Sequence, residues 1–405
     1  MACAKIAKAL VFISFAFSVL IICHSPAATP HDTPMASFWA WMLVHVTGLD
    51  GGGDIARLRA HRAAESAYAG APPQRGDWRP LQEEDAAALN ASRFRARYAV
   101  RRLPVVLRGF LDAHAGGGGD EPLHRKWALR RLRDRFRDVG VLVKRDQRSL
   151  ATLQRTTFGD YASAILEHKG AEGRTDFLAP TNELFHADPR MEVEAARVLD
   201  AVYELRGTPR HSFTTRLHTA NDKPFYFFTS QGGRFTPLHS DATTTFFVQL
   251  EGRKQFWLLP PDQTPYLYPR GDPLNFAYFS AVDDPTPAWG NADGGGDDGG
   301  SLPPLIQRAG GFFVTLEPGD LLYWPSFFWH SVHSIDDGDG APVSAFSVPA
   351  IVDVGGTFAA NPILATGFLL NPKVLANFVW GWATNQAGYL RSTYFRAATA
   401  DREEL

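Results

Sequence analysis

The chain has 405 residues, of which 45% are hydrophobic and 21% are charged. This composition is typical of a globular protein and excludes a largely disordered, collagen-like or coiled-coil chain. The net charge is −2, from 41 Lys and Arg against 43 Asp and Glu, so the basic excess of a dedicated nucleic-acid-binding protein is missing. The two cysteines, Cys3 and Cys23, cannot build a disulfide scaffold, a CxxC zinc site or a cysteine nucleophile.

The N-terminal residues have the pattern of a secretory leader. Lys5 and Lys8 introduce an almost wholly apolar run of 15 residues from Ala9 to Cys23. A membrane-spanning helix needs about 20 apolar residues, whereas the core of a signal peptide needs about 7–15. Because small residues follow the run, up to Ala27, we predict a signal peptide over residues 1–27, and the alternative is a short uncleaved anchor. In either case the remaining chain would face a lumen, and cleavage would remove both cysteines.

The last four residues, Arg402-Glu403-Glu404-Leu405, resemble a KDEL-type retrieval signal. Alone they read more simply as a solvated charged tail, but together with a signal peptide they predict residence in the lumen of the endoplasmic reticulum. The sequon Asn90-Ala91-Ser92 would be a permitted glycosylation site there.

The first half of the chain offers few motifs. Residues 28–94 contain none, and Leu103–Phe110 reads as a short buried strand that ends in a turn. Gly116–Gly119 reads as a flexible loop. Arg125–Asp138 has apolar residues at helical spacing and predicts one amphipathic helix. The opposite face of this helix is rich in arginine, which indicates a solvated face more strongly than a basic docking surface.

From about Phe225 onward the pattern predicts an all-β sandwich or barrel. Segments rich in β-branched and aromatic residues alternate with Gly, Pro and Asp clusters. These segments are Phe225–Thr229, Thr243–Leu250, Lys254–Leu259, Phe312–Leu316, Leu321–Trp324, Trp329–Ile335 and Val343–Val348. Asn291–Gly300 reads as a polar surface loop. Residues 353–401 read as a helical extension whose apolar face packs on the barrel or forms a dimer surface.

The most informative segment contains His239 and Asp241. In a strand, residues i and i+2 project to the same face, so these two side chains should lie close together. An imidazole and a carboxylate make two-thirds of the facial triad that binds non-haem Fe(II). The third ligand would be His330 or His333, which follow an aromatic-rich strand. Strand alternation places these two histidines on opposite faces, so only one of them should face a metal.

Hairpin geometry adds Lys254 to the same face. We expect a two-residue turn at Glu251-Gly252, with Gln249 opposite Lys254. Gln249 has the parity of His239 and Asp241, so Lys254 should share their face. A lysine directed into an apolar barrel is unfavourable unless it meets an anion, and a dicarboxylate cosubstrate would be such an anion. The alternative is a register slip by one residue, which would leave Lys254 in solvent.

Two runs carry a resemblance to a known family. TPLHSDATTTFFVQLEGRKQFWLLPP and PGDLLYWPSFFWHSVHSI resemble the JmjC-domain, cupin-like oxygenases and look closest to the small hydroxylases of that family. The resemblance covers about residues 95–352. It implies a mainly β fold with flanking helices, namely a double-stranded β-helix or jelly-roll.

The resemblance also implies roles for individual residues. His239, Asp241 and His330 match the iron ligands, and His330 matches the third ligand better than His333 does. Lys254 and Thr236 match the groups that bind the distal carboxylate of 2-oxoglutarate. Some relatives carry an Asn near the cosubstrate, where this chain offers Thr245 or Ser347. The match at Thr245 is loose.

The function implied is that of an Fe(II)- and 2-oxoglutarate-dependent dioxygenase that uses O2 to hydroxylate a protein side chain in the endoplasmic reticulum lumen. We expect a protein or peptide substrate and no nucleic acid. Contact with a membrane is expected only through an uncleaved leader, and a homodimer could form through the C-terminal helices. The alternatives are a non-catalytic cupin-like binding module, or a lumenal scaffold that uses the C-terminal helices as its working surface.

Overall fold

The computed structural model describes the central part of the chain. The described residues are 65, 76–114, 121–144, 153–167, 177–178, 183–207, 226–241, 243–272, 277–282, 305–338 and 341–350. The predicted signal peptide, the retrieval tetrapeptide, the two Gly-rich loops and the C-terminal helices lie outside them. No helix in the described ranges is both long enough and apolar enough to cross a membrane.

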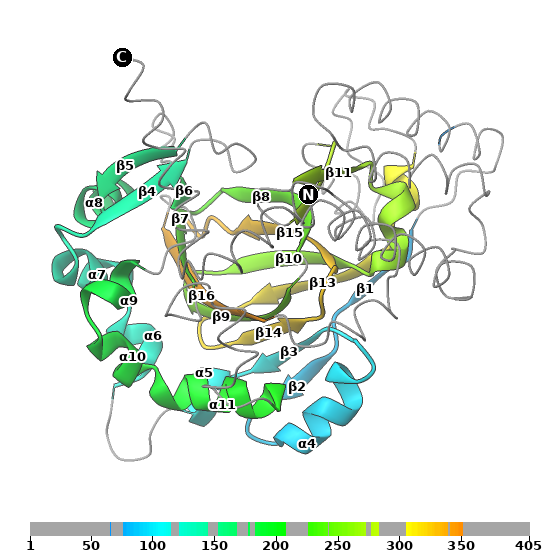
Figure 1. Cartoon of the computed structure of the whole chain (residues 1–405), viewed down its shortest axis with the longest axis horizontal. Coiled ribbons are helices and arrows are strands. Elements are labelled where there is room, and N and C mark those ends of the chain that lie inside the picture. The colour runs from blue at the N-terminus through cyan, green and yellow to red at the C-terminus, as the bar shows by residue number, and fades with distance from the viewer. Residues whose placement is uncertain are drawn as a thin grey trace, which may run out of the picture.

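Two large β-sheets form the centre of the molecule (Figure 1). The first has, in order, β1 (Trp78–Pro80), β13 (Gly311–Leu316), β10 (Lys254–Leu259), β15 (Trp329–Ser334), β8 (Phe235–Asp241), β12 (Ala277–Ser280) and β11 (Pro269–Asp272). The second has β2 (Glu83–Asp85), β3 (Val105–Arg108), β14 (Leu321–Trp324), β9 (Thr244–Glu251), β16 (Pro342–Ala350) and β7 (Tyr226–Gln231). The strands that we predicted from the sequence are all present, with ends that move by one or two residues.

The chain crosses between the two sheets again and again. Every connection from β7 to β10, and every connection from β13 to β16, leads from one sheet to the other. This path confirms the double-stranded β-helix that the resemblance implied. The space between the sheets is filled by apolar side chains of both, among them Phe247, Phe256, Leu258, Leu322, Trp324 and Val332.

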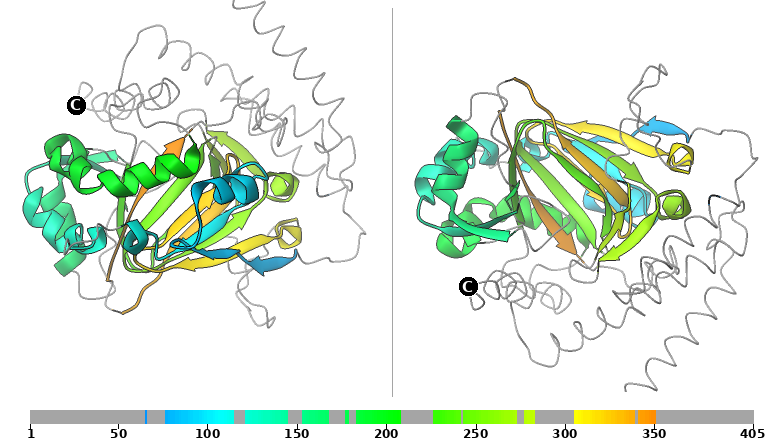
Figure 2. Two further views of the ribbon diagram at one scale, coloured as in Figure 1. Left: turned by 90° about the horizontal axis from the view of Figure 1, so that it is seen from below. Right: turned by 90° about the horizontal axis from the view of Figure 1, so that it is seen from above.

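Helices cover the other face of the second sheet. They are α4 (Ala91–Phe94), α5 (Phe110–His114), α6 (Leu123–Lys126), α7 (Leu129–Arg135), α8 (Phe158–Glu167), α9 (Glu183–Ala187), α10 (Arg190–Glu194) and α11 (Ala196–Arg206). A small third sheet of β5 (Leu153–Thr157), β4 (Gly140–Lys144) and β6 (Phe177–Leu178) stands beside them. Shorter helical turns are η1 (Arg95–Ala99), η3 (Pro261–Tyr266) and η4 (Ile306–Arg308). Figure 2 shows most of these helices gathered on one side of the barrel, where their apolar faces join the outer face of the second sheet in one core.

The single helix that we predicted over Arg125–Asp138 is wrong, because the structure has two helices there, α6 and α7. Between them Ala128 is extended, with φ −57° and ψ 138°. The Trp127 indole N–H donates to Glu194 at 2.8 Å, and the Leu129 amide donates to the Glu251 carboxylate at 2.7 Å. These tertiary contacts stabilise a break between the two helices that the local sequence does not predict.

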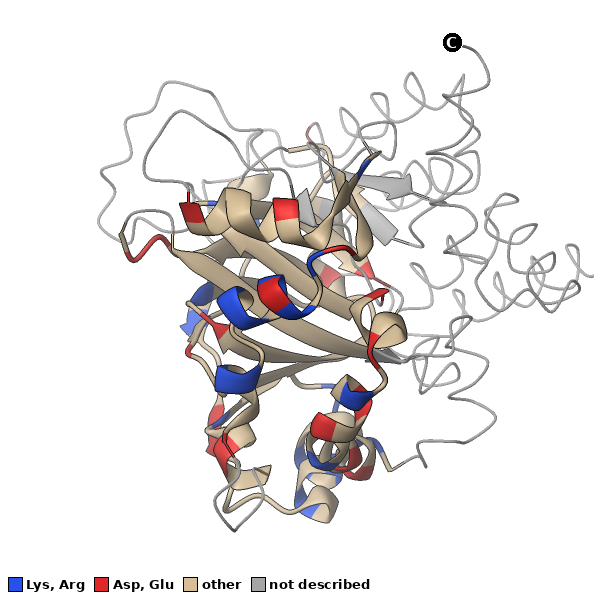
Figure 3. Ribbon diagram, turned by 90° about the vertical axis from the view of Figure 1, so that its left-hand side faces the viewer, with Lys and Arg blue, Asp and Glu red and all other residues tan. Residues whose placement is uncertain are grey.

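Arginines of α7 pair with acidic residues, and Figure 3 shows basic and acidic positions close together on the helices of this side of the molecule. Arg131 pairs with Glu121 at 2.6 Å, and Arg135 pairs with Asp188 and with Glu194 at 2.9 Å each. Much of the positive charge is therefore compensated, which agrees with a solvated face.

The hairpin that we predicted between β9 and β10 is also wrong. These strands belong to different sheets, and β10 pairs with β13 and β15. The turn at Gly252 is a corner between the sheets, where the Gln249 side chain amide donates to the carbonyls of Glu251 and Gly252 at 2.9 Å each. Gly252 has φ +64°, and a Cβ there would lie 2.7 Å from the Pro342 carbonyl oxygen, so only glycine fits this corner.

Candidate metal centre

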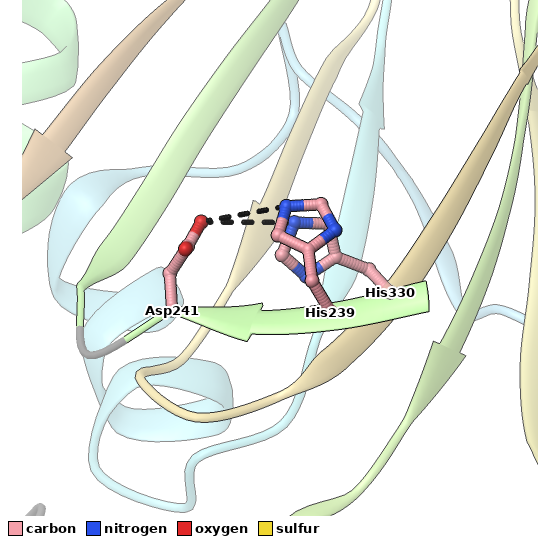
Figure 4. Close-up of side chains that lie close together, drawn as sticks. All are labelled: His239, Asp241 and His330. Carbon is pink, nitrogen blue, oxygen red and sulfur yellow. Dashed lines mark ion pairs between the residues drawn. The ribbon is translucent and has the colours of Figure 1, made fainter. Parts of the chain in front are cut away.

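Two neighbouring strands bring three potential metal ligands together. His239 and Asp241 share one face of β8, and His330 on β15 is the direct cross-strand partner of His239. The Nε2 atoms of His239 and His330 each lie 3.8 Å from Asp241 Oδ2. One ligand atom from each residue can be chosen so that all three lie within 4.8 Å of one another. Figure 4 shows the carboxylate directed at both imidazole rings.

Backbone carbonyls orient both imidazoles. His239 Nδ1 lies 2.8 Å from the Pro237 carbonyl oxygen, and His330 Nδ1 lies 3.1 Å from that of Phe328. A carbonyl can only accept, so each Nδ1 carries a proton, and in a neutral ring Nε2 then presents its lone pair toward Asp241. This is the arrangement in which metal-binding histidines are held by their surroundings.

Burial makes the charged forms of His330 and Asp241 unfavourable. The His330 side chain is 4% exposed and that of Asp241 is 33% exposed. Burial, with a smaller contribution from His239, lowers the pKa of His330 well below its usual value. Burial also raises the pKa of Asp241, against a smaller opposing effect of His239. The cluster thus offers a neutral His330 imidazole and a carboxylate that lacks a full counter-charge, donors suited to a divalent cation.

The structure distinguishes between the two candidate third histidines. His333 is paired with Phe235 rather than with a ligand residue. Its ring lies 5.7 Å from the Phe235 ring, on the face of β15 opposite to His330. The expected alternation therefore holds, and His330 is the histidine that joins the cluster.

A β-bulge in β8 explains how Thr236 can share the inner face with His239. His330 pairs with His239 and Val332 pairs with Thr236, so three residues of β8 span the length of two on β15. The extra residue, at Pro237–Leu238, restores the inward direction for Thr236. Simple alternation could not place Thr236, because three positions separate it from His239.

Lys254 lies in the barrel, as predicted, although the hairpin used to place it does not exist. It shares the inner face of β10 with Phe256 and Leu258, and Leu258 is opposite His330. Lys254 is 7% exposed, and its Nζ lies 5.3 Å from the centre of the Phe247 ring. Among the described residues no carboxylate pairs with this ammonium group. Burial lowers the pKa of Lys254 to about 8.

Thr245 and Ser347 also lie in the second sheet as buried residues. Thr245 is 5% exposed and opposite Trp324, and Ser347 is 5% exposed and opposite Phe247. Their registers place both on the inner face.

Two aromatic residues at the centre were not anticipated from the sequence. The Phe279 ring stacks on His239 at 5.4 Å, and the Trp324 ring lies 4.9 Å from His330. Phe279 belongs to a segment that we did not predict as a strand, so only its pairing with β8 reveals its place. Trp324 was part of a predicted strand, but its direction depended on the sheet pairing.

The sequence of the chain is also similar to those of known proteins. The family model described as "Cupin-like domain" matches residues 91–347. HSPB1-associated protein 1 from Rattus norvegicus is 35% identical over 106 residues, and its homolog from Danio rerio is 36% identical over 103 residues. JmjC domain-containing protein D from Dictyostelium discoideum is 32% identical over 103 residues. These matches cover 25–26% of the chain and only 20% of the length of each relative.

Proposed function

The chain belongs to the cupin-like domain family, with JmjC-type relatives, and from this premise we propose that it is an Fe(II)- and 2-oxoglutarate-dependent dioxygenase. The observation that carries the proposal is the cluster of His239, Asp241 and His330, whose ligand atoms lie within 4.8 Å of one another. Two imidazoles and one carboxylate, with positions left open, are the donor set of non-haem Fe(II) oxygenases. The carbonyl contacts of both Nδ1 atoms support it further, since they prepare the Nε2 atoms for a metal.

Different residues of the barrel would bind the metal and the cosubstrate. His239, Asp241 and His330 would hold the iron, and Lys254 and Thr236 would bind the distal carboxylate of 2-oxoglutarate. Thr245 is a candidate for a further cosubstrate contact. When bound, iron(II) supplies the O2-dependent oxidative decarboxylation of 2-oxoglutarate to succinate and CO2, coupled to hydroxylation of a substrate C–H bond. The apolar side chains that line the barrel would exclude water, and the protein would orient the substrate and the cosubstrate at the metal.

Lys254 gives this proposal its second support. A lysine held among Phe247, Phe256 and Leu258, with no acidic partner in the described chain, is unfavourable unless an anion joins it. The carboxylate of a bound 2-oxo acid would supply that charge. The same lysine has no evident use in a barrel that serves only as a scaffold.

We propose a protein side chain as the substrate. The relatives from Rattus norvegicus and Danio rerio are called HSPB1-associated, which describes a protein partner for them. By the same reasoning a protein or peptide is the expected partner of this chain. We further propose the lumen of the endoplasmic reticulum as its location, on the strength of the leader and of the final four residues.

Asn90 offers a test of that location. Asn90 is exposed, and its Oδ1 caps α4 by accepting from the Arg93 amide at 2.9 Å. A glycan is attached through the other amide atom, Nδ2, so the cap and a glycan are compatible. In cells, endoglycosidase H should shift the mobility of the parent chain but not of Asn90→Gln. A chain that carries no such glycan and fractionates with the cytosol would contradict the lumenal proposal.

The enzyme proposal is tested with the purified protein loaded anaerobically with Fe(II) and 2-oxoglutarate. After O2 is added, succinate should form in the parent and not in Asp241→Ala. His333→Ala is the matched control, because it removes a histidine from the same strand as His330 but from the opposite face. Succinate formation in this control should equal that of the parent.

Thermal unfolding of each variant checks that the protein is folded. If the folded parent binds neither metal nor 2-oxoglutarate by calorimetry, the oxygenase proposal is wrong and the binding-module alternative gains. Equal succinate formation by Asp241→Ala would also refute it.

A further inference from the structure

Lys254 has a buried polar neighbour that the proposed site does not use. Ser334 is the direct partner of Lys254 across the β10–β15 pair and shares its inward face. The Ser334 hydroxyl lies 2.9 Å from that of Ser230 on β7. The two serines are 6% exposed each. This Ser230–Ser334 pair therefore bridges the two sheets inside the barrel, beside the lysine.

The Ser230–Ser334 pair has one more hydroxyl proton than the hydrogen bond between the two serines uses. Each hydroxyl carries one donor and two acceptor positions. The bond between Ser230 and Ser334 uses one proton, and the second proton has no acceptor among the described residues. A buried donor without an acceptor is unfavourable, so the arrangement favours a ligand that can accept.

The surroundings determine the charge of that ligand. Cross-strand partners in an antiparallel pair have Cβ atoms about 4.5–5.5 Å apart, so the hydroxyl pair and the stem of Lys254 line the same space. Other inward neighbours, among them Phe247, Phe256 and Phe228, are apolar. The space thus presents a cation and an unused donor, with no carboxylate among the described residues, and this combination fits an anion.

We propose that the Ser230–Ser334 pair is a further anchor for the distal carboxylate of 2-oxoglutarate, in addition to Lys254 and Thr236. The inference rests on the proposed function and adds two residues to it. One carboxylate oxygen would pair with Lys254, and the other would accept from Ser334 or Ser230. Because Ser230 belongs to the second sheet, the pair also fixes how deeply the carboxylate enters. It thereby selects 2-oxo dicarboxylic acids over 2-oxo acids that have no second carboxylate.

Equilibrium binding to the metal-loaded full chain tests the proposal without relying on turnover. Calorimetry under anaerobic conditions compares 2-oxoglutarate with oxalate, which can chelate a metal but has no distal carboxylate. Loss of a hydrogen bond to a charged group should weaken 2-oxoglutarate by about 10-fold or more in Ser334→Ala. Oxalate binding should not change. Ser334→Thr keeps a hydroxyl and should restore most of the affinity.

Ser344→Ala is the matched control. Ser344 is a buried serine of β16 whose hydroxyl has no hydrogen-bond partner among the described residues, so the same atom is removed elsewhere. This variant should bind both ligands as the parent does. Ser230→Ala should reproduce the selective loss, since it removes the other half of the pair.

The outcomes separate this inference from the proposed function. If Ser334→Ala binds 2-oxoglutarate like the parent while Lys254→Met loses it, the inference is wrong and the proposed function stands. If Ser334→Ala weakens oxalate as much as 2-oxoglutarate, the pair is only a tie between the sheets and the inference is wrong. If the folded, metal-loaded parent binds neither ligand, the proposed function and the inference fall together.

Discussion

Replacement of Lys254 by methionine should make the protein more stable while it removes cosubstrate binding. Methionine keeps most of the apolar stem and has no charge to bury. Burial lowers the pKa of Lys254 from 10.5 to about 8, and this difference corresponds to about 3 kcal/mol of destabilisation of the charged lysine in the folded state. Because the folded-state pKa expresses the net cost of the buried charge, we expect Lys254→Met to gain up to about 3 kcal/mol in the free energy of unfolding at pH 7 without ligand.

The pH dependence of the stability difference between the parent and Lys254→Met distinguishes the effect of the charge from an effect of packing. Below about pH 8 Lys254 is protonated in both the folded and the unfolded protein, so the folded state carries the whole cost of its charge. Between about 8 and 10.5 the folded lysine releases its proton first, and the unfolded state binds more protons. The stability of the parent then rises with pH relative to that of the variant. The advantage of Lys254→Met should shrink over this range and be gone above it.

Urea unfolding at several pH values, with and without 2-oxoglutarate and a redox-inactive metal, measures both effects. When 2-oxoglutarate is added to the metal-loaded proteins, it should stabilise the parent by mass action and leave the stability of metal-loaded Lys254→Met unchanged. Arg253→Met is the control, because this neighbouring cation is exposed and already pairs with Asp337; its loss should change stability by less than about 1 kcal/mol in either direction. The reasoning is refuted if Lys254→Met is less stable than the parent at pH 7, or if the difference between them does not vary from pH 7 to 10.5.

Four further substitutions test other parts of the molecule. Gly252→Ala and Gly109→Ala both place a side chain at positive φ, but a Cβ at Gly252 would also lie 2.7 Å from a carbonyl oxygen, whereas one at Gly109 meets nothing within 4 Å. Urea unfolding should show that the free energy of unfolding falls by about 1 kcal/mol in Gly109→Ala and by clearly more in Gly252→Ala. Equal losses would contradict the close backbone approach at the corner of Gly252. Asp320 is 4% exposed and accepts from Arg108 and from two backbone amides, so Asp320→Ala should lower the free energy of unfolding by about 3 kcal/mol. Thr236→Val keeps the shape of the side chain, and calorimetry should show 2-oxoglutarate weakened by about 10-fold with metal binding unchanged. Unchanged affinity would remove Thr236 from the site.

The local elements were largely predictable from the sequence. Aromatic and β-branched runs bounded by Gly, Pro and Asp indicate the strands, and the alternation of side chains along a strand correctly places His239 and Asp241 on one face. The predictions that were wrong concerned long-range strand pairing. The partners of β10 are β13 and β15, which follow more than 50 residues later in the chain, and no local pattern records that pairing.

The break between α6 and α7 failed for a similar reason. Ala128 is a residue of high helix propensity, so the sequence favours a continuous helix there. The helix nevertheless ends because Glu194 binds the Trp127 indole and Glu251 binds the Leu129 amide. Both acids lie far away in the sequence, and tertiary contacts of this kind override propensity.

Lys254 shows why a conclusion can hold although its premise does not. A two-residue hairpin and a corner between facing sheets both turn the chain at Glu251-Gly252, and in both cases Gln249 and Lys254 keep one common face. In a hairpin that face is one side of a single sheet; in the barrel it is the space enclosed by two sheets. The parity of the sequence therefore determines which side chains point inward, but it leaves open which strand each one meets. Ser334 is a neighbour of Lys254 only because β10 lies beside β15. For this reason the sequence could indicate Lys254 as an anchor for a carboxylate but could not indicate Ser334.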